Sequence, residues 1–135
     1  MADSRLTLSL MLDTFAICRL DSSAAIPDWA DGGGFFSITR TEDELSIVCP
    51  QANVADEINI EKGWRCLKVE GPIAFSMTGI LVSLAAPLAE ACISIFVVST
   101  FDTDYLMVKE SHLERTIRVL TESGHTIHRQ PNEPS

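Results

Sequence analysis

The polar residues best suited to bind or react lie in one short segment, where a turn separates two apolar runs. This turn reads Ser99-Thr100-Phe101-Asp102-Thr103-Asp104, so hydroxyl groups, two carboxylates and an aromatic ring are close together. Turns between buried strands are usually built from Gly, Asn or Pro, which makes this composition unusual. Gly79, which precedes an apolar helical pattern, could lie beside it. We interpret the combination as a site for a small zwitterion rather than as a catalytic centre.

The start of that helical pattern is suited to binding an anion. The first N–H groups of a helix lack partners within the helix and carry a partial positive charge. We therefore expect an α-carboxylate near the backbone amides of four consecutive residues, Thr78, Gly79, Ile80 and Leu81. Glycine has no side chain to obstruct close approach of a ligand. Alternatively, Gly79 only allows the helix to pack closely on a sheet.

The turn offers groups for the opposite pole of a zwitterion. Asp104, with Asp102 as a second candidate, could receive an α-ammonium or a basic side chain. Thr100 and Thr103 offer hydroxyls, and Phe101 offers an apolar wall. A charge-assisted hydrogen bond in such a place contributes about 1.5–3 kcal/mol. The competing interpretation is that the two acids and two hydroxyls only stabilise a hairpin turn, with the phenyl ring in the core.

The other reactive residue types form no catalytic or metal-binding pattern. The four cysteines are far apart, with no CxxC pair and no suitably close histidine; they are Cys18, Cys49, Cys66 and Cys92. Each lies in or beside an apolar run, so we expect buried, reduced thiols and no zinc site. No phosphate-binding or dinucleotide-binding motif occurs. We therefore expect no metal, no cofactor and no enzymatic activity.

Composition narrows the classes of partner. The 135 residues are 46% hydrophobic, enough for a core, and carry a net charge of −9, which disfavours nucleic acids and anionic membrane surfaces. Residues 1–62 hold 11 acids and 4 bases (−7), and residues 63–135 hold 8 acids and 6 bases (−2). No apolar run reaches the length of a membrane span, and the N-terminus lacks a cationic start. We expect a cytoplasmic protein that is not bound to membranes.

Periodicity predicts short elements in the first half. In chain order we expect strands at 6–12 and 15–20 with a break at 13–14, a short helix at 27–30, hairpin strands at 35–39 and 45–49, and a weak helix at 51–61.

The second half has clearer patterns. In chain order we expect a strand at 64–69, a helix from about 79 to 88, strands at 93–99 and 104–109, a helix from 111 to 123, and a strand at 125–129. Ser76 or Thr78 would cap the first helix, and Pro87 would disturb its last turn. Ser111 and Glu114 match a capping box, and Gly124 should end the second helix.

The order of these elements predicts an α+β fold. Residues 64–129 follow the ferredoxin-like βαββαβ order, and residues 14–61 give a poorer version of it. We therefore predict two similar subdomains with antiparallel sheets, an N-terminal one over 1–62 and a C-terminal one over 63–129, followed by a disordered tail at 130–135.

The segments around the turn resemble a known family. Ser94–Val108, read with Thr78–Leu81 before it, is similar to the regulatory ACT domain, closest to the paired ACT domains of the aspartokinase and CASTOR type. The resemblance covers 64–129 and is loose for 14–61. It implies that a free amino acid binds where helix and strand meet, and that the assembly is paired, most often a homodimer. The matching positions are Gly79, Ile80, Thr100, Phe101 and Asp104.

The function expected is therefore that of a freestanding, allosteric sensor module for an amino acid. An alternative is a protein-interaction or dimerisation module whose ligand site is vestigial. An RNA-binding domain shares the βαββαβ order, but the strand at 93–99 has only Phe96 as an aromatic residue and the chain is acidic.

Overall fold

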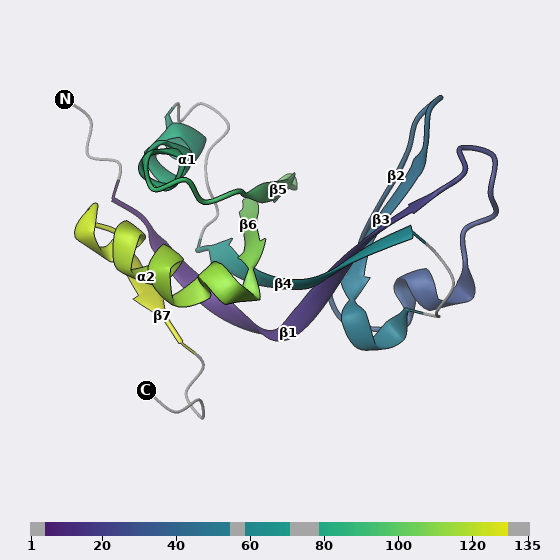
Figure 1. The fold of residues 1–135 in the computed structure, drawn as a ribbon, viewed down its shortest axis with the longest axis horizontal. Coiled ribbons are helices and arrows are strands. Elements are labelled where there is room, and N and C mark those ends of the chain that lie inside the picture. Colours follow the sequence, from purple (N-terminus) through teal and green to yellow (C-terminus); the bar gives the residue numbers. More distant parts are fainter. Residues whose placement is uncertain (1–4, 55–58, 71–78, 130–135) are drawn as a thin grey trace. The chain divides into compact units, whose positions relative to one another are not determined.

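The computed structural model describes residues 5–54, 59–70 and 79–129. Figure 1 shows the ribbon. The strands are β1 (Thr7–Leu20), β2 (Ser37–Arg40), β3 (Leu45–Pro50), β4 (Asn59–Val69), β5 (Phe96–Ser99), β6 (Asp104–Lys109) and β7 (Thr126–His128). The α-helices are α1 (Ile80–Glu90) and α2 (Leu113–Glu122), and the short 3-10 helices are η1 (Asp28–Asp31), η2 (Gln51–Asn53) and η3 (Glu110–His112).

The chain divides into two compact units. We call Asp13–Trp64 the hairpin unit, after its β2–β3 hairpin. We call the described residues up to Leu12 and from Arg65 on the helical unit, since they include both α-helices. Residues 5–12 thus group with the second half of the chain, whereas the sequence placed the whole of 1–62 in one subdomain. The predicted tail at 130–135 lies outside the described residues.

The helical unit follows the predicted βαββαβ order, from β4 through α1, β5, β6 and α2 to β7. Its sheet has the strand order β5-β6-β4-β1-β7, so the first part of β1 lies between β4 and β7. β1 pairs with β7 in parallel, with Thr7 opposite Thr126. That pairing is the reason that residues 7–12 belong to this unit.

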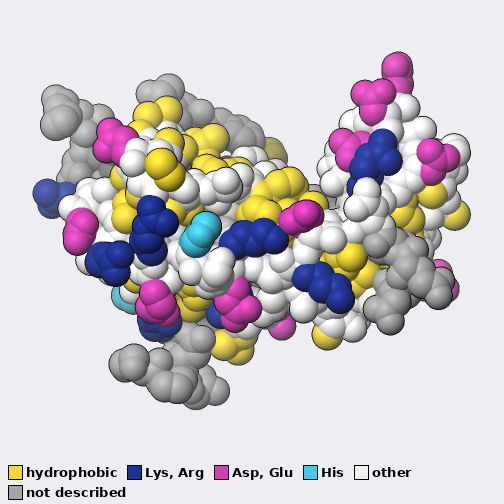
Figure 2. Space-filling view, viewed as in Figure 1, with side chains coloured by type: hydrophobic (Ala, Val, Ile, Leu, Met, Phe, Trp, Pro, Cys, Tyr) yellow, Lys and Arg dark blue, Asp and Glu magenta, His cyan; other side chains and the backbone are white. Residues whose placement is uncertain are grey.

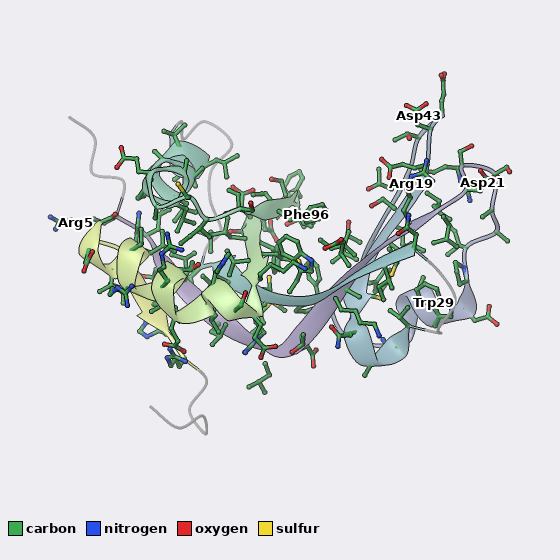
Figure 3. All side chains as sticks on the ribbon, in the orientation of Figure 1. Arg5, Arg19, Asp21, Trp29, Asp43 and Phe96 are labelled. Atoms are coloured by element: carbon green, nitrogen blue, oxygen red, sulfur yellow. The ribbon has the colours of Figure 1, made fainter. Side chains whose placement is uncertain are left out.

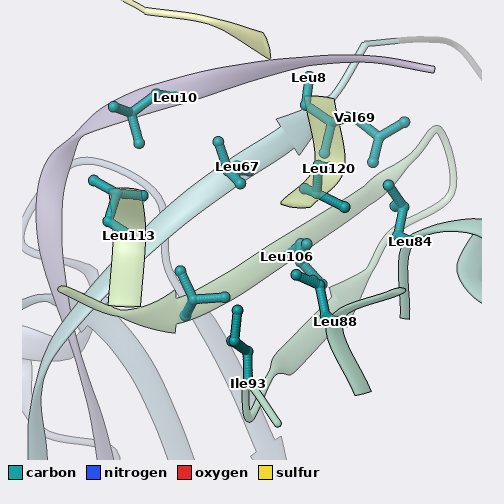
Figure 4. Close-up of a cluster of buried hydrophobic side chains, with 11 residues drawn as sticks. Leu8, Leu10, Leu67, Val69, Leu84, Leu88, Ile93, Leu106, Leu113 and Leu120 are labelled. Carbon is teal, nitrogen blue, oxygen red and sulfur yellow. The ribbon is translucent and has the colours of Figure 1, made fainter. Parts of the chain in front are cut away.

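A leucine-rich core holds the helical unit together (Figure 4). It forms because apolar side chains recur every second residue in the strands and every three or four in the helices. In α1 the buried positions are Ile80, Leu84 and Leu88, and α2 buries Leu113 and Leu120. Burying each such leucine stabilises the fold by about 1.5–3 kcal/mol.

Proline inside α1 does not end the helix, although the sequence predicted an irregular last turn. Pro87 has no N–H to donate to the carbonyl of Ser83, yet α1 continues to Glu90. The ring of His125 satisfies this carbonyl, with Nε2 3.0 Å from the oxygen of Ser83. Its Nδ1 accepts the N–H of Leu6 at 3.1 Å, so Nε2 carries the proton. The buried His125 thereby replaces the missing helical hydrogen bond.

The two ends of α2 differ in how well the sequence predicted them. The capping box is wrong: η3 spans Glu110–His112, so the α-helical part starts after His112 and has no side-chain cap hydrogen bond. Ser111 lies within that 3-10 turn and not at the N-cap. Gly124 ends the helix as predicted, with a φ of +103° that favours glycine.

The hairpin unit repeats the same order with shorter elements, from β1 through η1, β2, β3 and η2 to β4. Its strand order is β2-β3-β1-β4. The predicted hairpin is confirmed, with Ser37 opposite Val48 and Arg40 opposite Leu45. Single-turn 3-10 helices replace the two α-helices, and the core is built mainly from small side chains. Its buried members are Ala16, Cys18, Ala30, Leu45, Ile47 and Cys49.

Several predicted boundaries in this half are wrong. β1 runs without a break through Asp13-Thr14, because polar residues there mark exposure and not a turn; the boundary between the units falls at this point. The weak helix predicted over 51–61 is a 3-10 turn at 51–53 and strand from Asn59 on, with 55–58 outside the described residues. In the second half, β5 begins at Phe96 instead of 93.

The thiols are mostly as predicted. Cys18, Cys49 and Cys66 are buried and free, whereas Cys92 is exposed, contrary to the prediction. Burial raises the pKa of the Cys66 thiol to about 12. Burial, helped by neighbouring Cys49, raises the pKa of the Cys18 thiol to about 12 as well. Thiols of this kind are unreactive at neutral pH because the thiolate is the nucleophile.

Two negative findings apply to the described part of the chain. It contains no helix that is both long and apolar enough to cross a membrane. It also contains no group of three or more His, Cys, Asp or Glu side chains that could hold a metal ion.

Candidate ligand-binding site

The turn between β5 and β6 is held closed by its own threonines. The N–H of Thr100 donates to the carbonyl of Thr103 at 2.8 Å. The hydroxyl oxygen of Thr100 accepts the N–H of Thr103 at 3.3 Å and lies 3.1 Å from the Thr103 carbonyl. The hydroxyl of Thr100 therefore stabilises the turn.

Thr103 fastens this turn to the end of β4. Its side chain is buried, and its hydroxyl donates to the carbonyl of Val69 at 2.6 Å. A short hydrogen bond from a buried group fixes the turn, because losing it would leave a carbonyl unpaired. The hydroxyl proton of Thr103 is therefore used within the protein, and a ligand could only donate a hydrogen bond to the hydroxyl oxygen.

The remaining residues of the turn face solvent to different degrees. Asp102 is exposed, and Asp104 is half-buried at the start of β6, opposite Ser99 of β5. Phe101 is 80% exposed. The alternative that Phe101 belongs to the core is thereby excluded, and an apolar surface is available beside the two carboxylates.

Gly79 forms the N-cap of α1 and has a φ of +81°. A Cβ built at this position meets nothing within 4 Å, so glycine is not needed here for close packing against a sheet. Glycine is favoured because of its positive φ. The first intrahelical bond runs from the N–H of Ser83 to the carbonyl of Gly79 at 2.9 Å. The amides of Ile80 to Val82 therefore precede it, and the N-cap makes no side-chain hydrogen bond to them.

The predicted site residues around Gly79 divide into backbone and side-chain roles. Ile80 is buried in the core, so that only its backbone amide can reach a ligand. Leu81 and Val82 are exposed by 41% and 66%, and they surround the helix start with apolar surface. Thr78 lies outside the described residues.

The helix start and the turn lie at one end of the helical unit's sheet. α1 follows β4 in the chain, and Thr103 fastens the β5–β6 turn to the last residue of β4. In Figure 4, Leu84 lies beside Val69 while Leu88 lies further along the sheet, so α1 runs away from this end. The start of α1 and the β5–β6 turn are thus at the same end of the sheet.

Sequence analysis missed that the same turn occurs twice. In the hairpin unit, the N–H of Thr41 donates to the carbonyl of Glu44 at 2.8 Å. The hydroxyl oxygen of Thr41 accepts the N–H groups of Asp43 and Glu44, each at 3.1 Å. The sequences Thr41-Glu42-Asp43-Glu44 and Thr100-Phe101-Asp102-Thr103 share Thr-x-Asp, and that short signal could have identified the repeat.

Comparisons with known sequences and structures match both units. The family model described as an ACT domain matches residues 59–122, and a model described as an N-terminal domain matches residues 13–57. The human protein named cytosolic arginine sensor for mTORC1 subunit 1 is 40% identical over 94 residues, which cover 64% of this chain and 29% of that protein. The chain therefore spans less than a third of the length of such relatives.

Solved structures agree with this match. One from Agobacterium tumefaciens has 46% sequence identity and a TM-score of 0.90, covering 97% of this chain and 98% of that chain. The regulatory subunit of aspartate kinase from Thermus thermophilus has 12% identity and a TM-score of 0.58, covering 86% and 96%. Identity that low shows the fold alone. Together, these likenesses confirm the predicted α+β, ferredoxin-like fold.

Proposed function

This chain belongs to the ACT-domain family, and from that premise we propose that it is a regulatory module that binds a free amino acid in its helical unit. One observation supports the proposal: the start of α1 and the turn beside Asp102 and Asp104 lie at the same end of one sheet (Figure 4). Opposite poles of a small zwitterion could be held there together.

Each pole has its own partner. The α-carboxylate accepts hydrogen bonds from the amides of Ile80 to Val82 and lies at the positive end of the helix dipole. Thr78 is included on the strength of the sequence. Asp104 receives the α-ammonium or a cationic side chain, and Asp102 adds negative charge nearby. Thr100 and Thr103 keep the turn in place, while Phe101 shields one side of the ligand.

A cationic amino acid is the first candidate for this ligand. Two carboxylates in one turn favour a ligand with a positive charge in addition to its α-ammonium. The curated relative is named as an arginine sensor, which supports the same class. Arginine and lysine are therefore the ligands to try before neutral or acidic amino acids.

Binding would regulate assembly or a partner, without catalysis. The module has no metal cluster within its described residues. The relatives are named as a sensor or as regulatory parts of a kinase, which supports a non-enzymatic role. We propose that ligand binding changes the packing between two copies, in the cytoplasm. An alternative is a dimerisation module without a ligand, favoured by the exposed Leu81 and Val82 next to the site.

A thermal-shift screen against the twenty amino acids tests this function. We expect arginine or lysine at millimolar concentration to raise the Tm, and Asp104→Asn to remove most of that shift, because the substitution deletes the counter-charge. Asp43→Asn is the matched control, since Asp43 occupies the same kind of turn in the hairpin unit. Absence of a shift with all twenty, together with unchanged oligomerisation of Asp104→Asn, would favour the dimerisation module.

A further inference from the structure

The hairpin unit repeats the order of elements that surrounds the proposed site in the helical unit. Residues 21–27 follow β1 and lead to η1, as residues 70–79 follow β4 and lead to α1. The turn at 41–44 corresponds to the turn at 100–103, with the same threonine hydrogen bonds. One end of the hairpin unit is therefore comparable, position by position, with the site end of the helical unit.

The residues that close the two hairpins differ. Arg40 lies opposite Leu45 in the hairpin unit, whereas Ser99 lies opposite Asp104 in the helical unit. The helical unit thus has a short hydroxyl and a carboxylate at these two positions, and the hairpin unit has a long cation and an apolar side chain. The side chains beside the two turns therefore differ in charge and polarity, although the strand pairing around the turns is the same.

Arg40 reaches across to the segment that follows β1. Its Nη1 donates to the carbonyl of Ser22, and its Nη2 donates to the carbonyl of Ala24 at 2.8 Å. A turn, with the N–H of Ala24 bonded to the carbonyl of Asp21 at 3.0 Å, holds these carbonyls in place. The two nitrogens of one planar guanidinium therefore engage two backbone acceptors at once.

Arg19, at the same end of the unit, binds a different segment from Arg40. Its Nη2 donates to the carbonyl of Asp43 at 2.9 Å, which fastens the turn to the end of β1. In the helical unit Thr103 fastens the corresponding turn to β4. Figure 3 shows Arg19, Asp21 and Asp43 at this end of the hairpin unit. In Figure 2 acidic side chains gather there around a basic one. Arg19 is thus a fastener of the turn and leaves the Ser22 and Ala24 carbonyls to Arg40.

We infer that Arg40 is an internal ligand: its guanidinium occupies a cation site formed by the carbonyls of Ser22 and Ala24, at the end of the hairpin unit that corresponds to the site end of the helical unit. The correspondence between the two sites rests on the proposed function, but the guanidinium site itself does not. Ser99, which takes the place of Arg40 beside the corresponding turn of the helical unit, has no cationic group and cannot act in the same way. The hairpin unit would then accept a small guanidinium compound if Arg40 were shortened.

Arg40→Ala tests this inference, with ethylguanidinium as the probe and NMR of the full chain as the readout. We expect saturable shifts in the backbone resonances of residues 21–25 in the variant and none in the wild-type protein. Ethylammonium has the same charge but cannot donate from two coplanar nitrogens, so it should give shifts several-fold smaller. Arg19→Ala is the matched control, an arginine of the same unit that also donates to a backbone carbonyl, and it should not create the site.

Two results would overturn the inference. One is the absence of saturable shifts at 21–25 in a folded Arg40→Ala protein, and the other is equal shifts with ethylammonium. If Arg40→Ala does not fold, Arg40→Gln replaces it, because glutamine keeps part of the apolar stem and loses the positive charge and the second donor nitrogen. Amino acid binding in the helical unit is followed separately at Gly79 and Thr100–Asp104. Failure there contradicts the proposed function and leaves the Arg40 result intact.

Discussion

The turns at 41–44 and 100–103 have the same backbone hydrogen bonds but present different chemistry. In each, a threonine closes the turn through its N–H and its hydroxyl. The pair that closes the hairpin is Arg40 and Leu45 in one unit and Ser99 and Asp104 in the other. The same turn is thus kept in both units, while the two residues beside it change from a cation and an apolar side chain to a hydroxyl and a carboxylate.

The helices extend this contrast. α1 spans 11 residues and has no side-chain hydrogen bond from its N-cap, whereas η1 in the equivalent place spans 4 residues. A 3-10 turn of that length has few aligned peptide dipoles, so its partial positive charge attracts an anion only weakly. We therefore propose that the carboxylate of an amino acid binds at the start of α1 rather than at η1.

Loosening α1 should have the largest effect on this contrast. Leu84 is fully buried, so Leu84→Ala should reduce the free energy of unfolding by about 2–5 kcal/mol through lost burial and a cavity. Val82→Ala, on the exposed side of the same helix, should change it by less than about 0.5 kcal/mol. Urea denaturation measures both, and equal effects would show that α1 does not pack as described.

Removing the buried hydroxyl of Thr103 should separate the two turns. Thr103→Val keeps the shape but leaves the carbonyl of Val69 unpaired, at an expected cost of about 1–3 kcal/mol. Thr41→Val changes a turn whose hydroxyl is exposed, and should cost no more than about 1 kcal/mol. The comparison uses urea denaturation of the two variants. A larger loss for Thr41→Val would reverse our ranking of the turns.

Alkaline pH should destabilise both units through their buried thiols. Below the ordinary pKa of 9.0 both the folded and unfolded forms keep the proton, and the stability is fully present. Between 9.0 and about 12 the unfolded chain ionises first, so the free energy of unfolding falls as pH rises. Each thiol contributes a slope of up to about 1.4 kcal/mol per pH unit.

Replacing one buried thiol at a time measures how much each unit contributes to this pH dependence. Cys66→Ala should remove the share of the helical unit and Cys18→Ala that of the hairpin unit, as measured by urea denaturation across this pH range. Cys92→Ala, which alters an exposed side chain, is the control. A slope unchanged in both buried variants would mean that these thiols are accessible to solvent in the folded protein.

The smallest expected effect is a gain in stability at the end of α1, which has no counterpart in the hairpin unit. Cys92 has a φ of +60°, a conformation that favours glycine. Cys92→Gly should raise the free energy of unfolding by about 0.5–1 kcal/mol, measured by thermal denaturation. Ser94→Gly is a nearby exposed control expected to give no gain. Destabilisation by Cys92→Gly would imply a role for the sulfur.

The sequence was most informative where one periodicity dominated. The helical spacing of Leu84 and Leu88, and the glycine after α2, predicted both helices of the helical unit. The sequence-based prediction failed where polar residues fit either a turn or an exposed position in a strand. Asp13-Thr14 looks like a turn yet lies within a strand, because a local pattern cannot distinguish an exposed strand residue from a break.

Long-range pairing accounts for the other misses. The insertion of β1 between β4 and β7 joins residues more than 100 positions apart, and no local pattern encodes such a contact. The bond from Arg40 to the Ser22 and Ala24 carbonyls is equally invisible in the sequence, since its acceptors are backbone atoms. The candidate residues at 79–80 and 100–104 could be selected from the sequence, but the commitment of Thr103 to Val69 could not.

The most direct test of a two-pole site compares arginine with agmatine, which lacks the α-carboxylate, by NMR titration. With arginine we expect saturable shifts at the amides of Ile80 to Val82 and at residues 99–104. With agmatine the shifts at the turn should persist in part while those at the start of α1 disappear. Shifts at Ile80 to Val82 that are equal for both compounds, or binding of arginine that leaves both segments unperturbed, would contradict the site that we propose.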